Sequence, residues 1–319
     1  MNEMRQMVLV VAFAQAAVPA ITFAEVAPNP PTNLQIAGGA PTRSCPPYPS
    51  FPDETCTGPT PGVTLTVVTG DITYGSVYNG QTISGKDFRG IVRVTGANIT
   101  IKDSIFRGRA VNFNTGLIDT IDSTGTITLQ DVEVAPSNPS ATIDGMWLAN
   151  TNVYRAHVHG GVDGIKTFGN VLIEDSYIHG MQWFRNDPNQ GGGETHNDGV
   201  QSWNGPPNTT LRHNTIDMRY VVDVLAAGSP LVESRSNATW QDSSPNSRVE
   251  YNRLDGGACA LNFAMSSVTS KIYVISNHFG RHTFYQCGIV LNTTSALTQN
   301  TGNVWDDTGE PIPPPQQHD

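Results

Sequence analysis

The chain has 319 residues, of which 38% are hydrophobic and 14% are charged, with 31 glycines and 22 prolines. This composition suits one medium domain with many turns better than a helical protein. The net charge of −10 argues against a nucleic-acid partner, which would require a basic face. An acidic protein can still carry a small cationic cleft, so an acidic carbohydrate stays open as a partner.

Residues 1–24 predict an export signal. Arg5 precedes an apolar run, and Ala24 is a small residue suited to cleavage before Glu25. The alternative is an N-terminal membrane anchor, which is disfavoured because the run is short and is broken by a glutamine and a proline. No later stretch is long enough to span a bilayer. We therefore expect a secreted monomer without a membrane partner.

Export makes the cysteines expected disulfide partners. Several pairings are open from the sequence, and we favour Cys45 with Cys56 and Cys259 with Cys287. The second pair stands at the start of equivalent strands on consecutive coils of a strand repeat, where the distance suits the bond. The CxxC spacing of zinc ribbons is absent, so we expect no structural zinc site of that kind.

Composition changes along the mature chain. Residues 25–62 are rich in proline and glycine, which predicts a linker followed by a disulfide-stapled N-terminal cap. Residues 63–307 consist of short alternating stretches rich in Val, Ile and Thr between Asn, Gly and Asp turns, a pattern typical of strands. Residues 308–319 are expected to form a disordered tail.

The strand stretches, such as "VLIEDSYIHG" and "TLRHNTIDMR", form a repeat. Aligning them gives one inward apolar column: Phe106, Val134, Val158, Ile178, Ile216, Leu254 and Phe279. A constant strand pattern with variable spacing is what stacked coils with loop insertions give, because each coil buries its apolar face against its neighbours. We predict an all-β fold, a right-handed parallel β-helix, over a β-sandwich, whose hairpin turns are scarce here.

A second strand follows in each coil, as in "VDGIKTFG", "NDGVQSWN" and "QCGIVLNT". Asn-rich coils of this kind resemble the secreted right-handed parallel β-helix proteins of the pectate lyase-like superfamily. The resemblance covers roughly residues 63 to 305. It implies a carbohydrate-active protein.

Side chains alternate along a strand, so the residue after each inward one points outward. In the first column these are His159, His179 and Asp217 on three successive coils. They predict a polar ladder, and imidazole with carboxylate suits a transition metal. His196 joins the candidate functional histidines because it lies in the same part of the chain.

Two other histidines, His157 and His213, fall at other register positions and are expected to be structural. In the second outward column Asp163 and Asp198 stack, with Lys166 beside them. Stacked carboxylates repel unless Ca²⁺, a shared proton or Lys166 lies between them. The alternative is that such acids only cap backbone groups at the corners of the coils. We favour this alternative for Asp144, which stacks in the same column.

The insertion at residues 180–194 leaves the coil where this cluster forms, and loops on a rigid scaffold commonly build binding sites. Trp183 offers a flat apolar face for a sugar ring, and Arg185 offers a positive charge for a carboxylate. Gln201 and Trp203 on the following strand are further candidates for substrate contact.

The fragments "VDGIKT" and "HNDGVQSW" are similar to the calcium-binding strands of family 9 pectate lyases. The resemblance implies that Asp163 and Asp198 bind Ca²⁺, although Asn197 and Gln201 stand where that family has acids, which lowers the charge of the site. Including the first column, the candidate metal ligands are Asp163, Asn197, Asp198 and Asp217. The lysine base of that family has no counterpart, so a histidine or Lys166 becomes the expected proton acceptor.

These residues predict a polysaccharide lyase that cleaves a uronic-acid polymer by β-elimination, in which a cation, a base and a positive clamp act together. The candidate catalytic residues are Lys166, His159, His179, His196, Asp198 and Arg219. A glycoside hydrolase with Asp163 and Asp198 as acid and base is the alternative. A carbohydrate-binding solenoid without catalysis is the third hypothesis.

Overall fold

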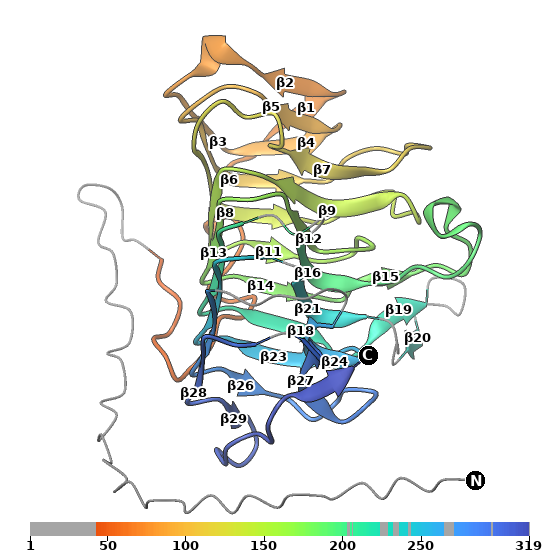
Figure 1. Ribbon diagram of the computed structural model, residues 1–319. Coiled ribbons are helices and arrows are strands. Elements are labelled where there is room, and N and C mark those ends of the chain that lie inside the picture. The colour runs from red at the N-terminus through yellow and green to blue at the C-terminus, as the bar shows by residue number, and fades with distance from the viewer. Residues whose placement is uncertain are drawn as a thin grey trace, which may run out of the picture. The chain divides into compact units, whose positions relative to one another are not determined.

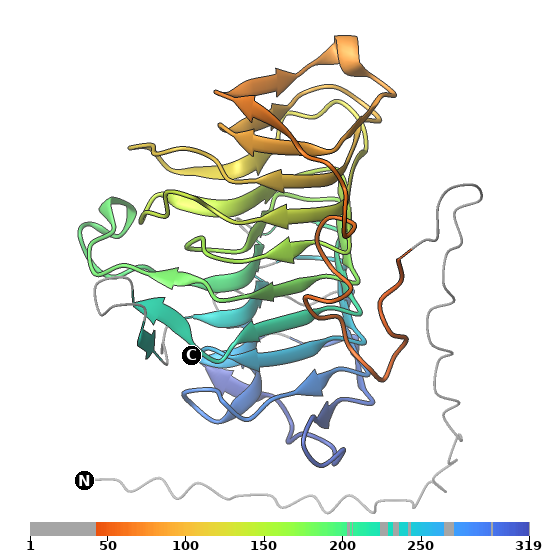
Figure 2. The same cartoon turned by 180° about the vertical axis from the view of Figure 1, so that it is seen from behind.

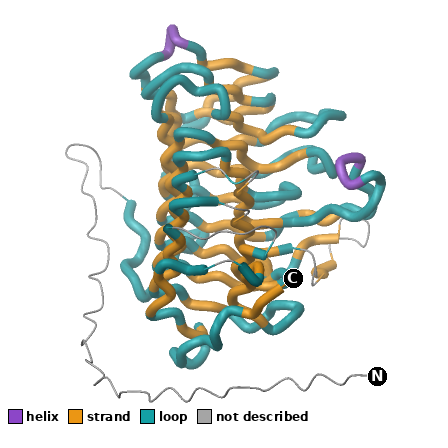
Figure 3. The backbone as a smooth tube through the Cα atoms, viewed as in Figure 1, coloured by secondary structure: helices purple, strands orange, loops and turns teal. Residues whose placement is uncertain are grey.

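The computed structural model describes residues 43 to 318, apart from 203, 204, 206, 224–228, 232–235, 242–243, 265–270 and 295. All of these belong to one compact unit, Gln35–Asp319. The predicted export signal lies outside the described residues. The helical elements in the described part are two short 3₁₀-helices, η1 (Ser76–Tyr78) and η2 (Pro188–Gln190), and the rest is strand and loop (Figure 3).

Successive coils place their strands side by side in stacked parallel sheets (Figure 1). The long sheet has 17 strands: β1 (Thr66–Thr69), β3 (Thr82–Ser84), β4 (Lys86–Arg89), β6 (Thr100–Phe106), β8 (Ile127–Val134), β10 (Thr151–Tyr154), β11 (His157–Val158), β13 (Val171–Glu174), β14 (Tyr177–His179), β17 (Thr209–Arg212), β18 (Thr215–Met218), β22 (Ser247–Glu250), β23 (Arg253–Gly256), β25 (Ile272–Ile275), β26 (His278–Phe279), β28 (Gln299–Thr301) and β29 (Val304–Trp305).

The short sheet has 10 strands: β2 (Ile72–Tyr74), β5 (Val92–Val94), β7 (Thr115–Asp119), β9 (Ile143–Leu148), β12 (Ile165–Thr167), β16 (Asp198–Ser202), β21 (Asn237–Gln241), β24 (Cys259–Phe263), β27 (Cys287–Asn292) and β30 (Gln316–His318). A side sheet of 3 strands projects from the coils: β15 (Gln182–Trp183), β19 (Val221–Asp223) and β20 (Ser229–Leu231).

The inward column expected from the repeat is observed in the predicted register. Val158 pairs with Val134 on one neighbouring strand and with Ile178 on the other. Ile216 continues the column between Ile178 and Leu254, and a phenylalanine ends it on each side. All of these side chains are buried. The parallel β-helix is therefore confirmed, with its core formed by the apolar residues that each coil presses against the next.

A left-handed residue followed by a buried asparagine turns the coil between its two long-sheet strands. His213 and Tyr251 have φ angles of 52° and 59°, which are uncommon for residues with a side chain. The next residues form a ladder: Asn214 Nδ2 donates to Asn252 Oδ1 at 2.9 Å, and Asn252 Nδ2 donates to Asn277 Oδ1 at 3.0 Å. Each bond contributes about 1 kcal/mol net. The ladder fixes the corner and hence the outward residues of the strand that comes after it.

Both predicted disulfides are present. Cys45 is bonded to Cys56, and Cys259 to Cys287, with a Cα–Cα distance of 5.0 Å in each pair. The second bond joins paired residues of β24 and β27, as the repeat predicts. No helix among the described residues is long and apolar enough to cross a membrane.

Residues 43–62 form a segment that we call the N-terminal strap. Instead of covering the N-terminal end as a cap, it runs along the side of the solenoid (Figure 2). The Gly58 N–H donates to Arg155 O at 2.9 Å, and His213 Nε2 lies 2.9 Å from Ser50 O. These partners belong to coils in the middle of the stack. At the other end, β30 pairs with β27, so a strand forms within the segment expected to be disordered.

Candidate functional site

The predicted site residues divide between two outer faces of the solenoid. On the short sheet they form the aspartate ladder, which consists of Asp144, Asp163 and Asp198. On the long sheet they form the histidine face, which consists of Glu133, His157, His159, Tyr177, His179, Asp217 and Arg219.

The aspartate ladder stacks as predicted, because β9, β12 and β16 pair in the expected register. Each acid accepts a hydrogen bond from the backbone of the next coil. The Asp163 N–H donates to Asp144 Oδ1 at 3.2 Å, and the Asp198 N–H donates to Asp163 Oδ1 at 2.7 Å. All three side chains are buried. The ladder therefore ties coils together in the way that capping acids do.

Lys166 supplies the positive charge between two of these acids. Its Nζ lies 2.8 Å from Asp144 Oδ2 and 2.9 Å from Asp163 Oδ2. Burial lowers the pKa of Lys166, but the two carboxylates outweigh burial and hold the pKa above its ordinary value. A protonated ammonium cannot accept a proton, so this geometry does not favour the base role expected for Lys166. It also lies where the carboxylates would share a calcium ion, so the donor set does not fit Ca²⁺ in this arrangement.

Asp198 lies at one end of the ladder, on the coil next to that of Lys166. Asn237 Nδ2 donates to its Oδ1 at 2.8 Å, and Gln201 Nε2 donates to its Oδ2 at 3.2 Å. Burial, and then the charge of Asp163, raise the pKa of Asp198 well above its ordinary value. Burial also raises the pKa of Asp163 to about 6 despite Lys166. Burial thus disfavours the charged form of both acids, and Asp163, with its pKa of about 6, is ionised at neutral pH.

The residues expected to complete a metal site do not join this ladder. Asn197 is fully buried, and its Nδ2 donates to Val162 O at 2.7 Å and to Gln182 O at 2.8 Å. Thr195 Oγ1 donates to its Oδ1 at 3.0 Å. Asn197 therefore holds the loop, and its oxygen already has a partner. Asp217 lies on the long sheet, so the four predicted ligands do not form one group.

The loop residues expected to bind substrate are used mainly by the protein. Trp183 in β15 is 7% exposed and packs into the core, so its ring does not offer a surface for a sugar. Arg185 Nη2 pairs with Asp223 Oδ2 at 2.9 Å, although the Arg185 side chain stays largely exposed. His196 is half-buried. Trp203 lies outside the described residues.

The histidine face is built from two outward columns at the ends of β8, β11, β14 and β18. In one column His157 pairs with Glu133 and with Tyr177. In the other His179 pairs with Asp217, as predicted. Residues two apart on a strand point to the same side, so both columns face outward together. His157 therefore shares the outward side with His159 and does not occupy the different register position expected for it.

Glu133, His157 and Tyr177 are the members that sequence reasoning missed. The available signal was the two-residue period itself: each of them stands two positions before an outward residue of the predicted column. The prediction considered only one outward residue for each strand and therefore did not include the second column.

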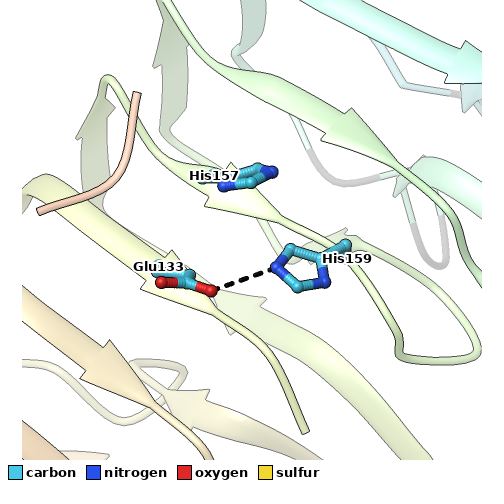
Figure 4. Close-up of side chains that lie close together, drawn as sticks. All are labelled: Glu133, His157 and His159. Atoms are coloured by element: carbon cyan, nitrogen blue, oxygen red, sulfur yellow. Dashed lines mark hydrogen bonds and ion pairs between the residues drawn. The ribbon is translucent and has the colours of Figure 1, made fainter. Parts of the chain in front are cut away.

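Short contacts between side chains join the face. His157 Nε2 lies 2.8 Å from His179 Nε2, and His159 Nε2 lies 3.2 Å from Glu133 Oε1. The rings of Tyr177 and His179 stack with centroids 4.2 Å apart and an interplanar angle of 16°. Figure 4 shows Glu133 and His159 joined by their contact, with His157 above them. These bonds run from side chain to side chain, whereas Asp144 and Asp163 of the aspartate ladder also accept backbone N–H groups of the next coil.

Burial sets the protonation of this face. It lowers the pKa of both His157 and His179 to about 4, so the two imidazoles are neutral at neutral pH and able to accept a proton. The hydrogen bond with His159 lowers the pKa of Glu133. Burial raises the pKa of Tyr177, which keeps its phenol protonated. The face thus combines neutral bases with a protonated hydroxyl.

Arg219 adds a permanent cation. Its Nε and Nη2 donate to the Asp217 carboxylate at 2.9 and 2.6 Å. The hydrogen bonds to Asp217 raise the pKa of Arg219 above its ordinary value. The Nη1 of Arg219 is not among the atoms that donate to Asp217 in this arrangement. A planar guanidinium held at one edge can present its other edge to a carboxylate.

Exposure separates the two faces. The side chains of Arg219, His159 and Glu133 are 38%, 31% and 24% exposed, whereas those of Lys166 and Asp163 are 13% and 4% exposed. A catalytic side chain must reach a polymer substrate. The histidine face is therefore the better candidate for the functional site.

The N-terminal strap borders this face. Gly58, with a φ of 77°, passes so close that a side-chain carbon there would lie 3.4 Å from the Cβ of His157. A residue with a side chain at this position would be strained by the positive φ and would contact the histidine. On another side of the histidine face, the chain continues from His179 directly into β15 of the side sheet.

Comparison with known proteins places the chain in no family. No family model matches it, and no curated protein matches it. Among solved structures, the A-module of Azotobacter vinelandii mannuronan C-5 epimerase AlgE6 is 9% identical, with a TM-score of 0.34 over 76% of this chain and 79% of that chain. The Dettilon tailspike protein is 11% identical, with a TM-score of 0.28 over 76% of this chain and 58% of that chain.

A third structure, QnrB1, a plasmid-mediated fluoroquinolone resistance protein, is 8% identical, with a TM-score of 0.26 over 67% of this chain and 91% of that chain. All three TM-scores are below 0.5. Likeness at this level carries no information about the reaction, which has to be inferred from the side chains of the site.

Proposed function

We propose that the chain is a secreted polysaccharide lyase that cleaves a uronic-acid-containing polysaccharide by β-elimination on the histidine face. The observation that carries the proposal is the stack of His179 on Tyr177 next to Asp217, the strand partner of His179, whose carboxylate holds Arg219. A neutral imidazole, a protonated phenol and a permanent cation stand together on a half-exposed surface. These are the three groups that the elimination requires.

The chemistry assigns one task to each group. Arg219 neutralises the carboxylate of the uronate, which acidifies the proton at C5. A ring nitrogen of His179 accepts that proton, since a neutral imidazole is a competent base. The Tyr177 hydroxyl donates a proton to the glycosidic oxygen as it leaves C4. The C5–H and C4–O bonds break, and a C4–C5 double bond forms.

The hydrolase alternative is less well supported. Paired carboxylates that act on a glycoside lie about 5 to 9.5 Å apart with the sugar between them. Asp163 and Asp198 are 3% and 1% exposed, and Asp163 Oδ1 accepts the backbone N–H of Asp198. Both acids are thus directed into the protein instead of toward a substrate.

Export belongs to the same proposal. Two disulfides are typical of proteins that mature in an oxidising compartment. A secreted enzyme of this kind would meet its polymer outside the cell. We propose an acidic polysaccharide as its partner and a monomer as its working form.

The test is a panel of uronate polymers incubated with the full chain. A lyase produces the ultraviolet absorbance of an unsaturated uronate, whereas a hydrolase produces reducing ends without that absorbance. The expected result is absorbance and reducing ends in equal amounts on at least one polymer. Reducing ends alone would establish the hydrolase, and binding without either signal would establish a carbohydrate-binding solenoid.

A further inference from the structure

Three side chains of metal-ligand type converge at the ends of β8 and β11 (Figure 4). Glu133 pairs directly with His157 across the two strands, and His159 lies two residues further on the same side. One nitrogen or oxygen atom from each residue lies within 4.8 Å of the other two. Among the described residues, no other group of three His, Cys, Asp or Glu side chains meets this condition.

We propose that Glu133, His157 and His159 bind a divalent transition-metal ion of the zinc class. Two imidazoles and one carboxylate suit zinc, cobalt, nickel, copper or iron, and three protein ligands leave a position open for water or substrate. Calcium prefers six to eight oxygen ligands. The donor types at this cluster therefore select a transition metal over calcium.

The spacing of the donor atoms is close to what an ion requires. Bonds of about 2.0 to 2.2 Å in a tetrahedron put ligand atoms about 3.4 Å apart. Glu133 Oε1 and His159 Nε2 are 3.2 Å apart. The rings of His157 and His159 lie with centroids 4.7 Å apart, and one nitrogen of His157 lies within 4.8 Å of the ligand atoms of the other two residues. The paired strands hold all three Cα positions without a backbone movement.

Charge and access also favour an ion here. Glu133 contributes a carboxylate, and its hydrogen bond with His159 connects the ligand atoms directly. The side chains of His159 and Glu133 are 31% and 24% exposed, so an ion can reach them from solvent. If the proposed function is correct, the open position would add a second positive charge near the uronate carboxylate. That electrostatic role rests on the proposed function, whereas metal binding itself does not.

The test uses the full chain without a histidine tag, stripped with chelator and titrated calorimetrically with Zn²⁺, Co²⁺ and Ca²⁺ in separate runs. We expect Zn²⁺ and Co²⁺ to bind with one-to-one stoichiometry, and Co²⁺ to develop the visible absorption of a low-coordinate site with nitrogen ligands. Absence of stoichiometric Zn²⁺ and Co²⁺ binding would overturn the proposal. No polysaccharide is present, so the result is independent of whether the protein is a lyase.

Two variants locate the site. Glu133→Gln and His159→Gln each remove one ligand, so Zn²⁺ affinity should fall on the order of 100-fold or more. His282→Gln is the matched control, because His282 is 56% exposed and pairs with Asp255 away from the cluster; its affinity should equal that of the original chain. Thermal melts verify folding, and Glu133→Gln alone decides if His159→Gln does not fold. Unchanged affinity in folded Glu133→Gln would overturn the assignment.

Discussion

The aspartate ladder and the histidine face are products of the same repeat, but their polar groups have different partners. In the ladder, Asp163 accepts the backbone N–H of Asp198 at 2.7 Å and the ammonium of Lys166 at 2.9 Å. In the histidine face, His157 and His179 contact each other through ring nitrogens, and the side chains are partly exposed. Backbone bonds make a stacked acid part of the scaffold. A stacked histidine whose bonds run to other side chains at the surface remains available for chemistry on a substrate.

Hydrogen-bond partners thus separate structural from chemical roles in a solenoid. Register alone brings like residues together in both faces, because strands stack about 4.8 Å apart. The consequence of that proximity depends on whether the neighbouring coil offers a backbone donor. Four predictions test this contrast between the two faces, in order of decreasing effect.

Replacing Lys166 with Met should destabilise the protein most. It would leave the buried carboxylates of Asp144 and Asp163 without the ammonium that now lies 2.8 and 2.9 Å away. Removing one partner of a buried ion pair costs about 3 to 5 kcal/mol. The measurement is the urea dependence of unfolding followed by circular dichroism.

The control is Lys102→Met, because that lysine is 41% exposed and 4.0 Å from Asp103; its stability should change by less than about 0.5 kcal/mol. If Lys166→Met kept full stability and lost all activity, the structural role assigned to the aspartate ladder and the catalytic role assigned to the histidine face would be reversed. The short sheet would then carry the chemistry.

On the histidine face, Tyr177→Phe should reduce turnover by about 100-fold or more, because the ring stack with His179 remains while the proton donor is lost. That factor corresponds to about 2.7 kcal/mol of transition-state stabilisation. Turnover is measured on the uronate polymer that the panel identifies, with the melting temperature measured in parallel. The matched control is Tyr154→Phe, from β10 on the preceding coil, which should keep normal turnover. Normal turnover in Tyr177→Phe would exclude this residue as the acid.

Asp198→Asn should have a smaller effect, and on stability instead of rate. Both oxygens of Asp198 accept a hydrogen bond, one from the Nδ2 of Asn237 and the other from the Nε2 of Gln201. The amide of an asparagine would replace one of these acceptors with a donor that faces another donor. We expect a loss of about 1 to 2 kcal/mol in the free energy of unfolding and turnover within a few-fold of normal. A 100-fold loss of rate in a stable variant would favour the hydrolase with its paired acids.

The sequence predicted the fold and the register well, because both follow from a period of two and from the burial of one apolar residue for each strand. Val158 and Ile178 pair as aligned, and the cysteines of β24 and β27 meet. It predicted Asp163, Lys166 and Asp198 as neighbours. The burial and the hydrogen-bond partners of these side chains could not be predicted from the sequence. They depend on which backbone N–H groups the corners of adjacent coils expose.

The path of the N-terminal strap shows the same limit. A loop far from the repeat in sequence has no register, so nothing predicted that Ser50 would meet His213. The second outward column is different, because Tyr177 and His157 follow from the same two-residue period as the first. It was predictable in principle.

The weakest effect concerns the contact between the strap and the solenoid. His213 Nδ1 lies 2.5 Å from Asp175 Oδ1 and its Nε2 lies 2.9 Å from Ser50 O. Both partners are acceptors, so both ring nitrogens should carry protons. Burial lowers the pKa of His213, but the hydrogen bonds to Asp175 and Ser50 outweigh burial and raise it above its ordinary value. A raised folded-state pKa means that the stabilisation is complete below the unfolded pKa of about 6.5 and is lost as the pH rises through the folded value.

The free energy of unfolding should therefore fall as the pH rises from about 6.5 through the raised folded-state pKa of this group. His213→Gln keeps the size of the side chain but cannot titrate, so its stability should lack this component of the pH dependence. Hydrogen exchange of residues 43–62 reports the same change locally, with faster exchange at the higher pH in the original chain beyond the intrinsic increase. If the pH dependence were identical in the two proteins, the charged form of His213 would not be what holds the strap.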